Sequence, residues 1–372
     1  MKSHRTDTPT PTRGKHVTVV GCGNIGSPLT GLIARMVAVQ RLTLVDQDVY
    51  ERDNLSGQAI RPDDVGRPKA IVQAERAKEI RPSLRVEPIH AAVEDVPWGR
   101  LRADVVLACL DSKIARQQVN QFAWRLGVPW VDAGVAADGL LARVTVFVPG
   151  EAQPCLECAW DERDYWTLEV KRPCQAGRGG TPTRAPAYLG SLAAALQAAE
   201  CAKILAGDWP SAAVGRQITV VVPTHRVLAM TFRRNPKCKF DHRTIPIQPI
   251  ACEPRKLPLR QFMAALGAKL GGADGIQIHL DGSPFARQWR CACGAEKVML
   301  ALAGRMPASR RACPRCGGSM APVGFAMLSA LSHETLTTHE LGKPLSSLGL
   351  AVGDVVHALT RDAEHVFELV KP

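Results

Sequence analysis

The chain has 372 residues, of which 46% are apolar, and it carries a formal net charge of +12 with a pI near 9.3. This length predicts about two domains, and the apolar content is enough to bury a real core. The positive charge favours an anionic partner, which could be a nucleotide, a nucleic acid or an acidic protein. Because the charge is spread along the chain and only 5% of the residues are aromatic, the composition argues against a dedicated nucleic-acid module.

The first fifteen residues are polar and are expected to form a disordered tail. They contain no apolar stretch of the kind that a secretory signal needs. No apolar run elsewhere is expected to reach the ~20 residues of a membrane span. We therefore expect a cytoplasmic protein with reduced thiols and no membrane contact.

Strands alternate with helices through the first 150 residues. A β-branched run at 16–20 ends at Gly21, a helix is predicted for 28–39, and a second strand at 42–45 ends at Asp46. Further helices are predicted at 70–80 and 115–126, and further strands at 84–90, 105–109, from 130, and 141–148. This alternation predicts an α/β fold with a Rossmann-like, mostly parallel sheet and helices on both faces.

The second half of the chain begins with a Pro/Gly-rich stretch, 149–186, which is expected to be functional or disordered. A helix at 187–206 and a hairpin of 217–222 with 226–232 follow. Near residue 245 the character changes to a Pro-rich linker. We therefore predict a tail at 1–15, a first domain at 16–245 and a small C-terminal zinc-binding domain at 246–372.

The segment Gly21-Cys22-Gly23-Asn24-Ile25-Gly26 is a GxGxxG turn between a strand and a helix. Glycines in such a turn let the backbone approach phosphate, and the helix N-terminus favours negative charge. Asp46 lies twenty residues past Gly26, where a carboxylate can hold ribose hydroxyls. These residues alone predict an adenine-nucleotide site, for which NAD is the default ligand.

The segments after Asp46 narrow this choice. They are Asp48, Asn54-Leu55-Ser56-Gly57-Gln58, Gly66-Arg67-Pro68-Lys69, Cys109-Leu110-Asp111-Ser112 and Val131-Asp132-Ala133-Gly134. In order, spacing and strand context this series resembles the ubiquitin-activating family, which includes the ThiF and MoeB proteins of thiamine and molybdopterin synthesis. The resemblance extends from about Lys15 to about His242. It implies adenylation, in which a carboxylate attacks the α-phosphate of ATP and pyrophosphate leaves.

The resemblance also implies a role for each matching residue. Asp46 would bind ribose, Lys69 would neutralise the α-phosphate region, and Asp111 would hold Mg²⁺. Asn54 and Gln58 would contact phosphates. The full set of predicted nucleotide-binding residues is Gly21, Gly23, Asn24, Gly26, Asp46, Asp48, Asn54, Gln58, Lys69, Asp111 and Arg116.

One position departs from the family. Where this chain has Gly57, the family has an arginine that supplies charge to the phosphates. Its loss should weaken catalysis unless a nearby residue such as Arg61 or Arg67 replaces it. A binding scaffold that has lost adenylation is therefore an alternative reading.

A CxxC pair, Cys155 and Cys158, could be redox-active, buried or metal-binding. Downstream, Arg234-Asn235-Pro236-Lys237-Cys238 resembles the family's R-N-P-x-C, which leads into a Cys₄ zinc site. No second cysteine follows here, but His242 does, so we predict a structural Cys₃His zinc site of Cys155, Cys158, Cys238 and His242.

Cys174 precedes an Ala-Gly pair, as does the thioester or persulfide nucleophile of many family members. Lys171, Arg172 and Arg178 give it a positive neighbourhood that would lower its pKa. An inert loop cysteine is the alternative. Cys201 lies within the predicted helix and is expected to be part of the core.

Four further cysteines form two close pairs separated by nineteen residues, a spacing typical of a zinc ribbon. They are Cys291, Cys293, Cys313 and Cys316. The alternative is four reduced thiols in two tight pairs. We expect this C-terminal domain to dock a carrier protein or a downstream enzyme.

These observations predict an ATP-dependent activating enzyme that uses ATP, Mg²⁺ and Zn²⁺. It would adenylate the C-terminal glycine of a ubiquitin-like or sulphur-carrier protein and pass it to Cys174 as a thioester. A conjugating enzyme and a second copy of the chain are the further expected partners. The alternatives are a sulphur-carrier adenylyltransferase without the thioester, the scaffold, and a nicotinamide-dependent oxidoreductase, which leaves Lys69, Asp111 and the zinc pair unexplained.

Overall fold

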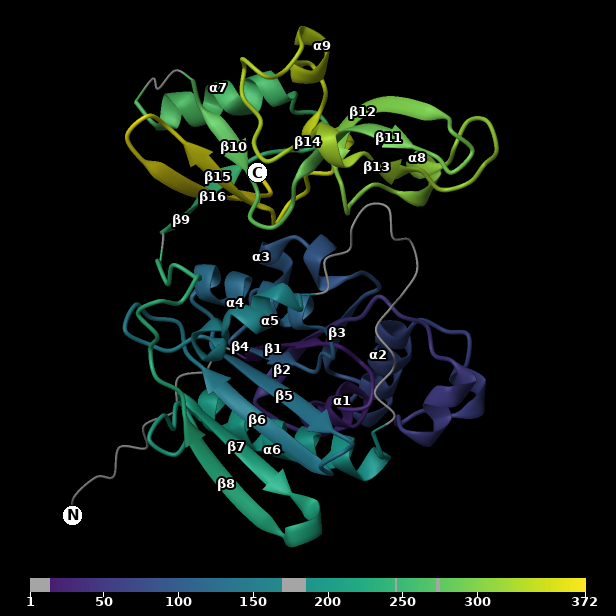
Figure 1. Ribbon diagram of the computed structural model, residues 1–372, viewed down its shortest axis with the longest axis vertical. Helices are drawn as coiled ribbons and strands as arrows, with labels where there is room; N and C mark the ends of the chain where they lie inside the picture. The colour runs from purple at the N-terminus through teal and green to yellow at the C-terminus, as the bar shows by residue number, and fades with distance from the viewer. Residues whose placement is uncertain (1–13, 169–184, 245, 272–274) are drawn as a thin grey trace, which may run out of the picture.

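The computed structural model describes residues 14–168, 185–244, 246–271 and 275–372 (Figure 1). Eight strands form one sheet in the order β3-β2-β1-β4-β5-β6-β7-β8. Neighbours from β3 to β5 run parallel, and neighbours from β5 to β8 run antiparallel. The strands are β1 (Lys15–Val20), β2 (Val39–Val45), β3 (Arg85–Ile89), β4 (Val105–Ala108), β5 (Trp130–Ala136), β6 (Leu141–Phe147), β7 (Arg216–Val221) and β8 (Arg226–Thr231).

Helices cover both faces of this sheet, as predicted. Alternate residues of β1 face opposite sides of the sheet. Val17 and Val19 pack with one group of helices, and Val20 packs with the other. A strand buried on both faces reads as a continuous apolar run. The first group is α1 (Gly26–Ala34), α2 (Lys69–Ile80) and α6 (Ala187–Ala206), and the second is α3 (Trp98–Leu101) and α4 (Lys113–Leu126).

Two expectations about this unit are wrong. The helix predicted for 28–39 ends at Ala34, because Val39 is already a buried residue of β2 and the guanidinium of Arg81 donates to the carbonyl oxygens of Met36 and Val39. Helix α6 does have the length and mean hydropathy, 1.3, of a membrane span. It is nevertheless a core helix, since its buried Gln197 donates to backbone carbonyls of β4 and β5.

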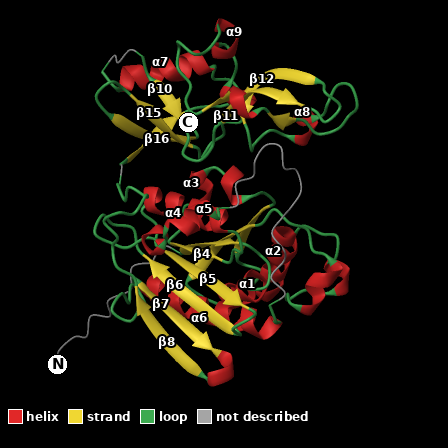
Figure 2. Cartoon of the chain, viewed as in Figure 1, coloured by secondary structure: helices red, strands yellow, loops and turns green. Residues whose placement is uncertain are grey.

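The remaining elements form a second, smaller unit that lies above the large sheet in Figures 1 and 2. One sheet has the order β10-β15-β16-β9, and helix α7 contributes to its core. A second sheet is built on the hairpin of β11 and β12. The elements are β9 (Ile247–Ala251), α7 (Leu259–Lys269), β10 (Gln277–His279), β11 (Phe285–Arg290), β12 (Glu296–Leu302), α8 (Ala308–Arg311), β13 (Ala321–Pro322), β14 (Met327–Leu328), α9 (Thr338–Leu341), β15 (Val355–Leu359) and β16 (Glu364–Val370).

The two units share a packed seam. Val355 and Val366 belong to the same buried cluster as Trp98 of α3. Polar contacts reinforce it, since Arg102 lies 2.6 Å from Glu368 across the seam. The second unit therefore rests on the face of the sheet that α3 and α4 cover.

Candidate nucleotide and metal sites

The ends of three parallel strands bring the predicted nucleotide residues to one edge of the sheet. The order β2-β1-β4 places the carboxyl ends of these strands side by side. The N–H of Gly21 donates to the carbonyl of Val45, and the N–H of Cys109 donates to that of Val20, both at 2.8 Å. The glycine turn, Asp46 and the segment leading to Asp111 therefore leave the sheet next to one another.

The three glycines of the turn have different reasons to be glycine. Gly21 has φ of +92°, and a Cβ there would lie 2.4 Å from the carbonyl oxygen of Cys109. A Cβ on Gly26 would lie 1.9 Å from the carbonyl oxygen of Gly21. A Cβ on Gly23 would meet no described atom closer than the Gln58 amide, at 3.9 Å. The fold itself therefore requires Gly21 and Gly26, whereas Gly23 keeps the approach to the turn open.

The side chain of Asn24 is hydrogen-bonded to neighbouring segments of the chain. Its Nδ2 donates to the carbonyl oxygens of Gly57, at 2.7 Å, and of Ala185, at 3.1 Å. The Oδ1 atom of Asn24 is buried and has no hydrogen-bond partner within the described chain. Asn24 thus fixes the turn against the segment around Gly57 and the start of α6.

Asp46 is held in place by two backbone donors. Its Oδ2 accepts from the N–H of Cys22 at 2.6 Å, and its Oδ1 accepts from the N–H of Asp48 at 2.8 Å. Burial nevertheless raises the pKa of Asp46 above its ordinary value. Each oxygen keeps a second lone pair, so the carboxylate can still accept hydrogen bonds from ribose hydroxyls.

Lys69 is tied to the same edge through Asp48. It is the first residue of α2 and only 8% exposed, and its backbone N–H donates to the carbonyl of Asp48 at 2.9 Å. Its ammonium lies 3.1 Å from the Asp48 carboxylate. The hydroxyl of Tyr50 donates to the carbonyl of Cys22, which anchors this segment to the glycine turn. The structure thus holds a buried cation beside the turn.

Asn54 and Gln58, which are predicted to contact phosphate, differ in how available their side chains are to a ligand. The Oδ1 of Asn54 accepts from the N–H of Glu51 at 2.9 Å and caps a short 3₁₀ turn. The amide of Gln58 faces the open side of Gly23, and its Oε1 is buried without a partner in the described segments. Gln58 is therefore the better placed of the two for a ligand.

Asp111 and Arg116 follow β4 and differ in availability. The Asp111 carboxylate is exposed, and Ser112 rather than Asp111 caps α4. The guanidinium of Arg116 is turned inward, where it lies 3.1 Å from buried Asp132 and donates to the carbonyl oxygens of Leu110 and Ala133. Arg116 thus braces the segment that carries Asp111.

The sequence did not predict that a second arginine pairs with Asp132. Arg143 on β6 lies 2.9 Å from Asp132, so one fully buried carboxylate pairs with two guanidinium groups. Asp132 could be found from the sequence, because it belongs to Val131-Asp132-Ala133-Gly134, one of the segments that carry the family resemblance. Arg143 had no such signal, since only the antiparallel pairing of β5 and β6 places it opposite Gly134.

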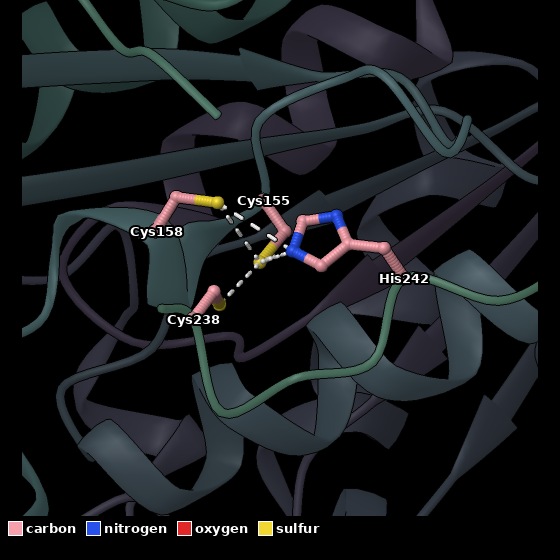
Figure 3. Close-up of side chains that lie close together, drawn as sticks. All are labelled: Cys155, Cys158, Cys238 and His242. Carbon is pink, nitrogen blue, oxygen red and sulfur yellow. Dashed lines mark hydrogen bonds between the residues drawn. The ribbon is translucent and has the colours of Figure 1, made fainter. Parts of the chain in front are cut away.

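The first predicted zinc ligands converge (Figure 3). Sγ of Cys155 lies 3.9 Å from that of Cys158, 3.8 Å from that of Cys238 and 3.2 Å from Nε2 of His242. Four ligand atoms at zinc's ~2.3 Å Zn–S and ~2.0 Å Zn–N distances would lie ~3.4–3.8 Å apart. Trp124 holds His242 in place, because its Nε1 donates to the backbone carbonyl of His242 at 3.1 Å and its ring packs edge-on against the imidazole. The donor set fits a tetrahedral zinc ion.

The second cysteine cluster also converges. Cys291 and Cys316 have their sulfur atoms 3.5 Å apart, Cys293 and Cys313 have theirs 3.6 Å apart, and all four lie within 4.8 Å of one another. Gly294 and Gly317, with φ of +83° and +72°, form the tight turns beside these pairs. This cluster, in the sheet of β11 and β12, could hold a zinc ion as predicted.

Residues 11–240 match the ThiF family. The chain belongs to the ThiF family. It is 29% identical over 230 residues to the molybdopterin-synthase adenylyltransferase of Escherichia coli, covering 61% of this chain and 87% of that protein. It is 31% identical over 162 residues to a ubiquitin-like modifier-activating enzyme 5 of Oryza sativa, covering 40% of this chain and only 38% of that protein.

A solved structure shares the ThiF fold. The microcin C7 biosynthetic enzyme MccB, in complex with N-formylated MccA, superposes with a TM-score of 0.50 at 22% identity over 61% of this chain and 67% of that one. The likeness concerns the fold alone. The match to the ThiF family ends at residue 240, so the sheets built from β9 onwards lie outside it.

Two cysteines bear on the predicted nucleophile. Cys174, the predicted nucleophile, lies outside the described residues. Cys201 is fully buried in α6, and burial raises its thiol pKa to about 12. The thiolate is the nucleophilic form of cysteine, so Cys201 is confirmed as a core residue.

Proposed function

We propose that this ThiF-family chain uses ATP to adenylate the C-terminal glycine of a small ubiquitin-like or sulphur-carrier protein. The observation that carries the proposal is the placement of Lys69, buried and paired with Asp48, beside a glycine turn in which a Cβ on Gly23 would meet no described atom closer than 3.9 Å. The Escherichia coli and Oryza sativa relatives support it, since one is named an adenylyltransferase and the other a ubiquitin-like modifier-activating enzyme.

The proposed reaction is an in-line attack on the α-phosphate. The open side of Gly23 admits the phosphates, and Asp46 accepts from the ribose. Lys69 exchanges Asp48 for the α-phosphate and stabilises charge that grows as the glycine carboxylate oxygen attacks phosphorus. The bond from phosphorus to the bridging oxygen breaks, and pyrophosphate leaves. Exposed Asp111 would hold Mg²⁺, which neutralises the phosphates when bound.

The later steps belong to the same proposal. In it, Cys174 attacks the acyl adenylate, forms a thioester and releases AMP, and the chain acts as a cytoplasmic homodimer with domains at 16–245 and 246–372. The alternative stops at the adenylate and serves sulphur transfer, and the adenylyltransferase name of the Escherichia coli relative favours it equally. Replacing Cys174 with serine should trap an ester-linked carrier under the first reading, whereas no adduct should form under the second.

ATP–pyrophosphate exchange tests the adenylation step. The assay uses the full chain with a small β-grasp carrier protein that ends in glycine. Lys69→Ala and Asp111→Asn should each lower exchange by about 100-fold, the size of effect that follows loss of one transition-state charge contact. Lys78→Ala, at the exposed end of the same helix, should leave exchange unchanged. Equal exchange in Lys69→Ala and the parent chain would remove the lysine from the mechanism.

A further inference from the structure

Two histidines and two carboxylates gather in the second unit, apart from both cysteine clusters. His279 of β10 pairs directly with His357 of β15, and Glu364 begins β16. One ring nitrogen of each histidine and one oxygen of Glu364 lie within 4.8 Å of one another. Asp281 completes the group, because its two oxygens lie 3.4 Å from Nε2 of His279 and 3.4 Å from Nε2 of His357.

The hydrogen bonds around His357 define which nitrogen carries the proton. Its Nδ1 lies 2.7 Å from Oε1 of Glu364, whose other oxygen accepts from Arg243 at 2.9 Å. Because the Arg243 guanidinium balances the charge of this carboxylate, Glu364 accepts the hydrogen bond and Nδ1 of His357 donates it. His357 is 1% exposed, and with Nδ1 as the donor to Glu364 the neutral tautomer leaves a lone pair on Nε2.

That lone pair faces a carboxylate oxygen. Nε2 of His357 is buried and has no hydrogen-bond partner within the described chain, although the Asp281 oxygen is only 3.4 Å away. Two electron-rich atoms at this distance repel each other unless a positive centre lies between them. Nitrogen and oxygen ligands at ~2.0–2.2 Å from a tetrahedral cation would be ~3.3–3.5 Å apart.

We propose that His279, His357 and Asp281 bind a divalent transition-metal cation, with Glu364 as the carboxylate that orients His357. Imidazole nitrogen and carboxylate oxygen are ligands that such cations accept. A carboxylate on the far nitrogen of a ligating histidine fixes its tautomer and raises its basicity, and Glu364 occupies that position.

The charges around the site leave room for a cation. Arg125 of α4 lies 3.6 Å from Asp281 and is also paired with Asp241, while Arg243 is paired with Glu364 and Asp241. Three carboxylates therefore face two guanidinium groups around the two imidazoles. Because Arg125 and Arg243 come from outside the second unit, the cation would brace the seam between the units. The side chains of His279 and Asp281 are 22% and 15% exposed, which gives the cation a way in.

Metal counting tests this site independently of adenylation. The full chain is loaded with Zn²⁺, freed of loose metal on a chelating resin and analysed by mass spectrometry. We expect three zinc ions per chain, and two in His279→Gln and in Asp281→Asn. His333→Gln, which changes an exposed histidine elsewhere in the second unit, should keep three. Retention of two zinc ions in the variants shows that the cysteine clusters, and hence the fold around them, are intact.

Cobalt distinguishes the third site by its ligands. Co²⁺ added to the chain after both cysteine clusters hold zinc should give visible absorption without thiolate-to-cobalt charge transfer, and Asp281→Asn should abolish this absorption. Two zinc ions in the parent chain, or equal zinc and cobalt uptake in the parent and the Asp281→Asn variant, would overturn the proposal. In that case Asp281 accepts hydrogen bonds from protonated imidazoles instead.

Discussion

Replacing Gly23 with alanine separates the role of the glycine turn in folding from its role in binding. A Cβ at this position would meet no described atom closer than 3.9 Å, and the backbone there does not adopt a positive φ. Alanine also restricts the unfolded chain, so we expect stability to change by less than ~1 kcal/mol, in the stabilising direction. The melting temperature should therefore be equal to or slightly above that of the parent chain.

Nucleotide binding should respond in the opposite direction. The methyl group would occupy the open side of the turn, where the proposed phosphates meet backbone N–H groups. A hydrogen bond to a charged group is worth ~1.5–3 kcal/mol, so losing one should weaken ATP binding by about 10-fold to 150-fold. Titration calorimetry with ATP and Mg²⁺, run beside a thermal melt of the same sample, measures both effects.

The neighbouring glycine provides the contrast. A Cβ on Gly26 would lie 1.9 Å from the carbonyl oxygen of Gly21, so Gly26→Ala must displace backbone and should lower stability and binding together. If Gly23→Ala instead bound ATP within two-fold of the parent chain while remaining folded, the open side of Gly23 would not be the phosphate site.

Three further predictions concern other parts of the chain. Gly57→Arg should raise pyrophosphate exchange by up to about 10-fold, because φ of −127° and nearest Cβ contacts of 3.4 Å accept a side chain that supplies one charged contact. Cys238→Ala should remove one zinc ion by mass spectrometry and destabilise the chain by about 4 kcal/mol in denaturant melts. Glu340→Gln should lower the melting temperature at pH 7 by about 2–4 °C. Burial would raise the pKa of Glu340, but hydrogen bonds from Thr337 and Arg287 outweigh burial and hold this pKa below its ordinary value of 4.5. The difference in melting temperature between the variant and the parent chain should therefore vanish in acid. The ionised group thus stabilises the fold above pH 4.5, and this contribution is lost as the pH falls through the lowered pKa.

The order of strands and helices could be predicted because each carries a local signal. The helix at Ala187–Ala206 was predicted to the residue, since Pro186 precedes it and Gly207 in the left-handed conformation ends it. The end of α1 was missed because residues 35–38 continue its apolar spacing. Only the packing of Val39 into the sheet and the bonds from Arg81 end the helix there.

The metal sites and the nucleotide edge differ in how far the sequence could predict them. Cys238 and His242 could be joined to the CxxC pair only through a resemblance to family spacing, and the structure brings them together. Arg116 was interpreted as a phosphate contact, and only the fold shows its guanidinium turned inward to Asp132. The cluster around His357 had no signal, because its members come from separate strands without a motif.

The pairing of Lys69 with Asp48 explains how the chain can keep a buried cation beside the glycine turn when no nucleotide is bound. A lysine that is only 8% exposed would be strongly destabilising without a counter-charge. Asp48 supplies that charge, yet its own side chain is 57% exposed, so it can return to solvent at little cost when an anion replaces it. The Asp46 carboxylate, in contrast, belongs to a half-buried residue and is fixed by two backbone donors. In the proposed function, the edge would combine one fixed carboxylate for a neutral ribose with one exchangeable ion pair for a phosphate, which is the charge arrangement that binding of ATP requires.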